Sequence, residues 1–491
     1  MITNNSILST LYILIIGFHL TVSWNQSSAH VIPDEVSYLT QARYFSGKDA
    51  FPDTKAFLAR ESSFAGSDTL PSTENWPYYH FGYSLLVSPI YWLADTPSAA
   101  YKGIMIFNSF MLSTLFLIIF FWIRMISKVK FSTAIAISFI VSLYPPYVFQ
   151  AQIGWAENAF IPGFALCCLL YTQHLRTNSI ATVILFSLMA GFQFTIHPRG
   201  LAVAIAATIC LICLSLVDKD KWQLSLIGVS IISVIFIITK LISGELAIMM
   251  NTVSHGDTII QNLSSIFELE LFTAVIGNLL YLALATLGFF LLGVTEGVKQ
   301  IINTYSKNPK SLVSDIYTGP LIFLFTASSL MFCVSIAFLG RSEEWHNISR
   351  TLDFFLYGRY NEAFLSIYIA LGLLWICHTH EKSLKNLSRP LNISFWILAA
   401  VSITFFLFLS DFRYLRSIHS FGLFPWYIVS TVTVEWLGNA PIYIAPLLWT
   451  WLVLQLFLQS HVKGLVTIGI YFFLLNISLL VYHTPSLQIF G

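Results

Sequence analysis

Long apolar runs separated by short polar segments recur from one end of the chain to the other. Each run is close to the roughly 20 residues that a helix needs to cross a bilayer, and no soluble fold needs so many of them. The pattern predicts an all-α, polytopic membrane protein with about 13 spans. The predicted spans are residues 7–24, 103–123, 131–149, 157–174, 180–196, 200–217, 224–242, 271–294, 318–339, 363–378, 391–410, 441–459 and 464–482.

The composition also favours a membrane protein over a soluble one. Hydrophobic residues make up 56% of the 491 residues and charged residues only 10%, whereas an average globular chain carries about 25% charged residues. Such a chain lacks the solvated surface that a soluble protein of this length needs. We therefore expect one continuous membrane domain over 1–491, without a nucleic-acid partner, in place of the roughly three soluble domains that length alone suggests.

Two apolar runs need a separate interpretation. The run 7–23 is interpreted as a retained first span and not a signal peptide, because no Lys or Arg precedes it and no clear small-x-small cleavage site follows it. The stretch 85–93 is too short to cross a bilayer and contains Pro89, so it predicts an interfacial helix.

The cysteines all fall inside apolar runs, where a zinc site or a disulfide framework is not expected. Even the Cys210-x-x-Cys213 pair predicts small apolar core residues, since no second pair accompanies it. We therefore predict no cysteine metal site. The six cysteines are Cys167, Cys168, Cys210, Cys213, Cys333 and Cys377.

The basic residues predict a cytoplasmic N-terminus, following the positive-inside rule. With this orientation 13 of the 25 Lys and Arg residues lie in cytoplasmic loops, against five of the 24 Asp and Glu residues. The long loops then face outward, and long irregular outer segments are where a membrane protein can build a site. These outer loops are 25–102, 243–270, 340–362 and 411–440.

The first outer loop, 25–102, contains an acidic motif. A short helix is predicted to begin at Pro33, with Asp34 and Glu35 in its first turn, where the helix dipole favours acids. Helical spacing places Asp34, Tyr38 and Gln41 on one face and Glu35 on the next. Both acids are catalytic candidates. The alternative is a surface helix with helpful acids at its start.

A third acid, Glu157, stands at the mouth of an otherwise apolar span, just after Gly154-Trp155-Ala156. Ionisable residues near membrane depth are costly and tend to be functional, so Glu157 is also a catalytic candidate. The alternative is a side chain that snorkels into the headgroup zone.

A tight outer turn is predicted at His197-Pro198-Arg199-Gly200, which presents His197 and Arg199 together. Arg can grip a phosphate through two parallel hydrogen bonds, so this pair predicts phosphate binding. The alternative is an anchor to lipid headgroups.

A further outer segment, Tyr357-Gly358-Arg359-Tyr360-Asn361-Glu362, enters a predicted span. Gly358 allows a close backbone approach, and tyrosines suit a membrane interface. An aromatic belt explains the tyrosines but explains Gly358 and Arg359 between them poorly. Arg359 and Tyr360 are therefore substrate-binding candidates.

These groups on one side of the membrane suit transfer from a phosphate donor. A carboxylate can deprotonate an incoming hydroxyl, and cations can stabilise the departing phosphate.

The same residues resemble a known family. Pro33-Asp34-Glu35, followed by Tyr38 and Ala42-Arg43, is similar to the first-loop signature of GT-C glycosyltransferases. The closest groups are the protein O-mannosyltransferases and the lipid A aminoarabinose transferases. The segment 80–86, beginning with His80, resembles the end of that loop, and Glu157 matches the acid of the second outer loop. The resemblance covers 1–200 best.

The resemblance implies a GT-C-like helical bundle and an inverting hexosyl- or pentosyltransferase with a polyprenyl-phosphate sugar donor. It makes Asp34 the catalytic base, Glu35 its neighbour, and Glu157 a second acid that holds the acceptor or a metal. The acceptor is a glycan, lipid or protein, membrane lipids surround the chain, and a divalent cation stays open as cofactor. The substrate-binding candidates are Tyr38, Arg43, His80, His197, Arg199, Arg359 and Tyr360.

Two other functions fit the pattern less well. A transporter or lipid-carrier flippase would place ionisable residues inside helices near the midplane and often shows internal repeats, but most acids here fall in loops on one side. A non-catalytic scaffold would not need Asp34, Glu157 and Arg199 to converge. Sequons on the outer side are frequent by chance in such a chain, so we expect a bacterial inner membrane.

Overall fold

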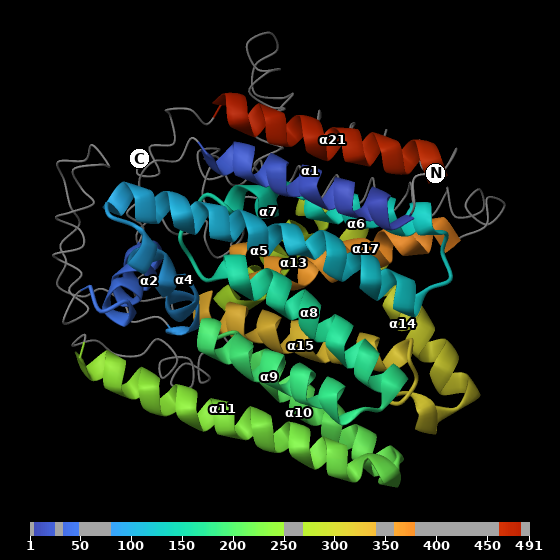
Figure 1. Ribbon diagram of the computed structural model, residues 1–491. Helices are drawn as coiled ribbons and strands as arrows, with labels where there is room; N and C mark the ends of the chain where they lie inside the picture. The colour runs from blue at the N-terminus through green and yellow to red at the C-terminus, as the bar shows by residue number, and fades with distance from the viewer. Residues whose placement is uncertain are drawn as a thin grey trace. The chain divides into compact units, whose positions relative to one another are not determined.

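The structure is a computed structural model, drawn in Figure 1, and the residues that it describes form helices joined by short turns. The described residues are 4–24, 33–48, 80–249, 269–339, 358–378 and 461–482. Two compact units divide the chain, the first built from 1–129, 147–266 and 299–338 and the second from 130–146, 267–298 and 339–491.

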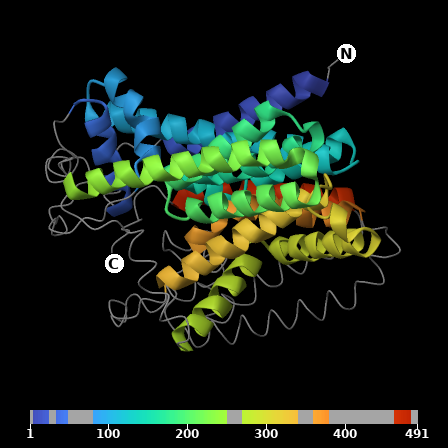
Figure 2. The ribbon, with the colours of Figure 1, turned by 90° about the horizontal axis from the view of Figure 1, so that it is seen from below.

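The first unit is built around two groups of packed helices. α5 contacts both α1 and α8, and a buried hydrogen bond of 2.8 Å joins the hydroxyls of Ser23 and Ser109 across α1 and α5. α9 contacts α8, α10 and α11, which run beside it (Figures 1 and 2). The helices that lie mainly in this unit are α1 (Asn4–Trp24), α2 (Pro33–Phe45), α4 (Gly82–Leu93), α5 (Pro97–Ile126), α7 (Pro145–Gln150), α8 (Glu157–Thr177), α9 (Ile180–Ile196), α10 (Gly200–Val217), α11 (Trp222–Met249) and α15 (Thr318–Leu339).

The second unit packs around α6, which contacts both α17 and α21. The Asn476 amide on α21 donates to the carbonyl of Leu143 just after α6, at 2.8 Å. α17 is buried on every side from Glu362 to Ile376. The described elements are α6 (Phe131–Ser142), α13 (Leu269–Ala285), the 3-10 turn η6 (Gly358–Asn361), α17 (Glu362–His378) and α21 (His461–Tyr482).

Within the described residues, six helices are long and apolar enough to cross a membrane. They confirm the predicted all-α, multi-pass membrane architecture. The count of about 13 spans stays a prediction, because 391–410 and 441–459 lie outside the described residues. The six are Asn4–Trp24, Ser98–Ile126, Gly200–Val217, Lys219–Ile248, Thr318–Ile336 and Gly358–His378.

The predicted span 271–294 is wrong, because the chain turns in its middle. α13 ends at Ala285 and α14 (Phe289–Lys307) begins three residues after Thr286. Leu287 and Gly288 take left-handed φ values of 53° and 82°, and the Gly288 N–H donates to the Ala283 carbonyl at 2.7 Å. A left-handed residue at this point ends a helix, and hydropathy alone does not register such a turn.

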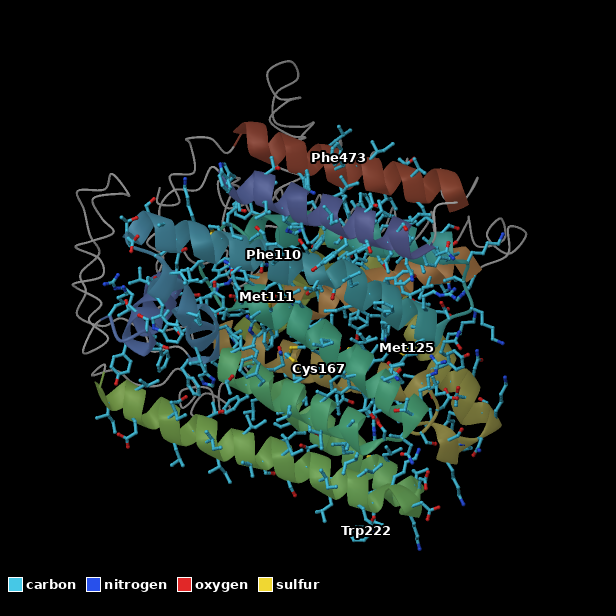
Figure 3. The ribbon with its side chains drawn as sticks, viewed as in Figure 1. Phe110, Met111, Met125, Cys167, Trp222 and Phe473 are labelled. Atoms are coloured by element: carbon cyan, nitrogen blue, oxygen red, sulfur yellow. The ribbon has the colours of Figure 1, made fainter. Side chains whose placement is uncertain are left out.

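The prediction that the cysteines are core residues is confirmed for three of them in the first unit and wrong for Cys333, while Cys213 and Cys377 are partly buried. Cys167, Cys168 and Cys210 are buried, and Cys167 lies between helices while Trp222 points away from them (Figure 3). Cys333 on α15 is exposed. An apolar run predicts a helix, but it does not say which of its residues face inward.

Candidate functional site

The acidic motif lies on α2, which begins at Pro33 and carries Asp34 and Glu35 in its first turn, as the sequence predicts. The alternative of a surface helix is wrong, since every residue over 35–42 is buried. α2 packs against α4, where the rings of Tyr38 and Tyr83 meet edge to face at 5.5 Å. A helix buried in this way holds its first turn in a fixed place.

The two neighbouring acids occupy different environments. Glu35 is fully buried, and its Oε1 accepts the Tyr101 hydroxyl at 2.6 Å and the backbone N–H of Gly154 at 2.7 Å. Asp34, about 100° further round the helix, is partly exposed. A general base must reach its substrate. Asp34 is therefore the more accessible of the two acids, and Glu35 joins α2 to the segment before α8.

The segment before α8, residues 151–156, is held by amide side chains on both sides. The Ile153 carbonyl accepts the Asn108 amide at 2.9 Å and the Asn158 amide at 2.7 Å. Tyr83 in turn donates to Asn108 Oδ1 at 2.8 Å. Burial raises the pKa of the Tyr83 phenol well above its ordinary value, so Tyr83 keeps the proton that it donates. Hydrogen bonds from several helices thus fix the start of α8.

Glu157 is the first residue of α8 and pairs with Arg199. Glu157 Oε1 lies 2.9 Å from an Arg199 guanidinium nitrogen, and the two side chains are only 1% and 3% exposed. Burial at this level is incompatible with a snorkelling acid at Glu157 or a headgroup anchor at Arg199. The Arg199 guanidinium also lies over the Phe160 ring, 5.3 Å from its centroid. A buried charge needs such a partner, because an unpaired one is expensive.

The predicted turn at 197–200 is confirmed between α9 and α10. The Gly200 N–H donates to the His197 carbonyl at 2.8 Å. A Cβ at Gly200 would come within 2.1 Å of the Gln193 carbonyl carbon, so only glycine fits here. The Arg199 N–H and Nε both donate to His197 Nδ1, at 3.1 and 3.2 Å. The turn therefore presents His197 and Arg199 together, as the sequence predicts.

The end of the first loop lies against the C-terminus of α9. His80 Nδ1 hydrogen-bonds to the Phe194 carbonyl, and the two rings meet edge to face at 4.8 Å. A Cβ at Gly82 would come within 2.4 Å of Thr195 Oγ1, which shows how closely the two segments pack. His80 therefore contacts α9 at Phe194, three positions before His197 in the sequence. Its role toward the substrate stays a prediction.

Arg43 lies at the other end of α2. Its guanidinium is stacked over the Tyr91 ring of α4, 5.7 Å from the centroid. This contact adds to the packing of α2 on α4, so Arg43 has a structural role whether or not it also meets a substrate.

Arg359 and Tyr360 belong to the second unit. Arg359 is buried, with its guanidinium 6.0 Å from the centroid of the Tyr360 ring. Gly358 lies against the Tyr281 ring, where an added Cβ would come within 1.6 Å. This confirms the close approach predicted for Gly358. An aromatic belt alone does not account for a buried arginine.

Next to Arg359 lie two buried hydrogen-bonded pairs that sequence reasoning did not single out. The Tyr281 hydroxyl donates to Glu362 Oε1 at 2.5 Å, and the Asn361 amide donates to Asn278 Oδ1 at 2.8 Å. Glu362, like Glu157, is an acid at the first position of an apolar helix. This shared position is a sequence signal that could have identified Glu362 as a candidate. Tyr281 and Asn278 sit inside an apolar run and give no comparable signal.

The described residues contain no group of three or more His, Cys, Asp or Glu side chains that could hold a metal. Glu157, the acid that the resemblance offers to a metal or acceptor, is paired with Arg199 instead. A divalent cation would therefore compete with this guanidinium for the Glu157 carboxylate.

Comparisons with known proteins found similarity in solved structures only. No family model and no curated protein matches the chain. The crystal structure of ArnT from Cupriavidus metallidurans bound to undecaprenyl phosphate is similar at 13% identity and a TM-score of 0.49, over 97% of this chain and 77% of that one. The apo structure of the same ArnT gives the same identity and TM-score, over 98% of this chain and 78% of that one.

Proposed function

We propose that this protein is an inverting membrane glycosyltransferase that moves a sugar from a polyprenyl-phosphate donor to a hydroxyl acceptor at the extracytoplasmic face. One observation carries the proposal. The partly exposed Asp34 shares its helix turn with Glu35, whose bond to Gly154 connects it to the segment that begins α8 with the Glu157–Arg199 pair. An accessible base and a buried cation therefore belong to one hydrogen-bonded framework.

In the proposed reaction Asp34 accepts the proton of the acceptor hydroxyl. The hydroxyl oxygen forms a bond to the anomeric carbon from the face opposite the phosphate, and the bond from that carbon to the phosphate oxygen breaks. Polyprenyl phosphate leaves with the bonding electrons, and the configuration at the anomeric carbon inverts. Arg199 stabilises the charge that develops on the leaving phosphate.

In this proposal Arg199 binds the donor phosphate either together with Glu157 or in place of it. The guanidinium lies 2.9 Å from Glu157, and its planar group of N–H donors can bind a phosphate as a second anionic partner. Glu157 thus sets how strongly Arg199 binds a phosphate, and it can take a hydroxyl of the acceptor when Arg199 turns to the donor. His197, which accepts from Arg199 Nε, keeps the guanidinium oriented in both states.

The remaining candidates take substrate-binding roles in this proposal. Tyr38, Arg43 and His80 are proposed to bind substrate from the first-loop side. Arg359 and Tyr360 stay substrate-binding candidates within the second unit. The proposed location is a bacterial inner membrane. A divalent cation is the alternative group that could stabilise the departing phosphate.

Transfer of label from a panel of radiolabelled polyprenyl-phosphate sugars to membrane acceptors tests the function directly. The purified wild-type chain is expected to transfer at least one of these sugars, and the Asp34→Asn variant, which keeps the shape of the side chain, is expected to lose that transfer. Absence of transfer with every donor, from a protein that is folded, would contradict the proposal. Adding a chelator to the active reaction decides whether a divalent cation takes part.

A further inference from the structure

α14 differs from the membrane-spanning helices that precede it. It begins after the turn at Leu287 and Gly288 and continues as a single helix to Lys307, in gold in Figure 1. It is not among the described helices that are apolar enough to cross a membrane. Its 19 residues include Glu296, Lys299 and Lys307. A helix of this length with charges in its second half is typical of an interface and not of a bilayer core.

One face of α14 is buried against the second unit over the first half of the helix, which belongs to that unit. Phe289, Phe290, Gly293 and Glu296 are buried. A Cβ at Gly293 would come within 2.2 Å of the Tyr368 carbonyl oxygen, so α14 approaches α17 closely. Packing on this face sets the direction of the helix, and the acid of the helix, Glu296, is buried in it.

A second face of α14 carries exposed apolar side chains at helical spacing. Leu291, Val298, Ile302 and Tyr305 are all exposed. Their positions i, i+7, i+11 and i+14 fall on one stripe of an α-helix. A water-exposed stripe of this kind is unfavourable, so an apolar medium must cover it.

The exposed charges of α14 and of the turn that follows it have one sign. Lys299, Lys307 and Lys310 are exposed. The acid that follows them, Asp315, is partly buried and accepts the backbone N–H groups of Tyr317 and Thr318 at 2.9 Å. Lys299 lies beside the stripe, and Lys307 and Lys310 lie at the C-terminal end of the helix, so the exposed charge of this segment is cationic and complements an anionic surface.

We propose that α14 with Lys310 forms a binding site for anionic phospholipids at the membrane surface. The apolar stripe enters the boundary between headgroups and acyl chains, and the three lysines bind headgroup phosphates. The lipid is chosen over a protein partner because the chain is a multi-pass membrane protein, so a bilayer lies next to this helix. The predicted cytoplasmic side of this segment, with its excess of basic residues, agrees with the assignment.

The test is to titrate the purified full chain in neutral detergent with phosphatidylglycerol or phosphatidylcholine and to count bound lipid by native mass spectrometry. The test variant is Lys299→Gln/Lys307→Gln/Lys310→Gln. The matched control is Lys128→Gln/Lys130→Gln/Lys219→Gln, which removes three exposed lysines from the same predicted side. Each lysine near an anionic surface raises affinity about fivefold. The affinity of the test variant for phosphatidylglycerol should therefore fall on the order of a hundredfold.

The control is expected to bind phosphatidylglycerol within about twofold of wild type. Replacing Val298 and Ile302 by Ser should weaken the binding of both lipids, since the stripe does not depend on headgroup charge. Wild-type phosphatidylglycerol affinity in the α14 triple variant would overturn the proposal, as would an equal loss in the control. Sugar transfer plays no part in this readout, so its outcome is separate from that of the proposed function.

Discussion

Glu35 Oε1 accepts the backbone N–H of Gly154 at 2.7 Å, across 119 residues of sequence. The same oxygen accepts the Tyr101 hydroxyl, which also donates to the Gln152 carbonyl at 3.2 Å. One buried carboxylate therefore joins α2, α5 and the segment before α8. We infer that its main contribution is to hold the site together.

Removing this carboxylate should destabilise the first unit. Glu35→Ala leaves the Gly154 N–H and the Tyr101 hydroxyl without their buried acceptor, at a cost of on the order of 3 kcal/mol in the free energy of unfolding. Tyr101→Phe removes the hydroxyl that Glu35 and the Gln152 carbonyl share, and should cost about 1 kcal/mol. Unfolding in detergent measures both. Equal stability of Glu35→Ala and wild type would show that the contact does not support the fold.

The Glu157–Arg199 pair should show strong coupling in a double-mutant cycle. Glu157→Gln leaves a buried guanidinium without its charge partner, as Arg199→Gln leaves a buried carboxylate, and each should cost roughly 3–5 kcal/mol. The double variant should lose much less unfolding free energy than the sum of the two single losses, because no unpaired charge is then buried. Additive losses in unfolding free energy would mean that the two side chains act independently.

The Gly358 contact can be tested against a glycine in open space. Gly358→Ala places a Cβ within 1.6 Å of the Tyr281 ring, so it should destabilise the second unit by about 1–3 kcal/mol. Gly244→Ala, on the exposed side of α11 with nothing within 4 Å, should be neutral or stabilise the helix by up to about 1 kcal/mol. Thermal unfolding of both variants gives the comparison. A Gly358→Ala protein as stable as Gly244→Ala would contradict the packing.

The orientation of the first loop needs its own measurement, because the proposed site depends on it. Ser62→Cys, combined with Cys333→Ser to remove an exposed thiol, should react with a membrane-impermeant reagent in intact cells if 25–102 is extracytoplasmic. Protection of this thiol until the membrane is opened would place the loop, and Asp34 with it, on the cytoplasmic side.

Local signals in the sequence were enough to predict several parts of the site. Pro33 before two acids predicts the start of α2, and Gly200 after Pro198 predicts the turn that presents Arg199, since each depends on only a few neighbouring residues. The bond from Glu35 to Gly154 and the pairing of Glu157 with Arg199 could not be read in this way. They join segments far apart in the sequence, and hydropathy and helical spacing do not say which distant segment a face meets.

The same limit applies to the environment of Glu35. Helical spacing predicts only that Glu35 lies on the face next to that of Asp34, whereas tertiary packing buries everything from 35 to 42. The hydropathy pattern also does not predict the turn at Leu287 and Gly288, because an apolar run continues across it. In both cases the residues indicate what can form a helix, and only the packing decides what that helix faces.

The last prediction separates the roles of the two adjacent acids by their rates. Asp34→Asn removes the base but keeps the side-chain shape, so the initial rate of transfer should fall by roughly 10²–10⁴-fold while folding and donor binding persist. Glu35→Gln keeps an amide oxygen that can still accept from Gly154 and Tyr101, so its rate should fall far less. Initial rates normalised to folded protein in detergent provide the measurement. Near-normal turnover by Asp34→Asn would refute its role as base, and a larger loss in Glu35→Gln would move that role to Glu35, with the buried carboxylate then acting as more than a support.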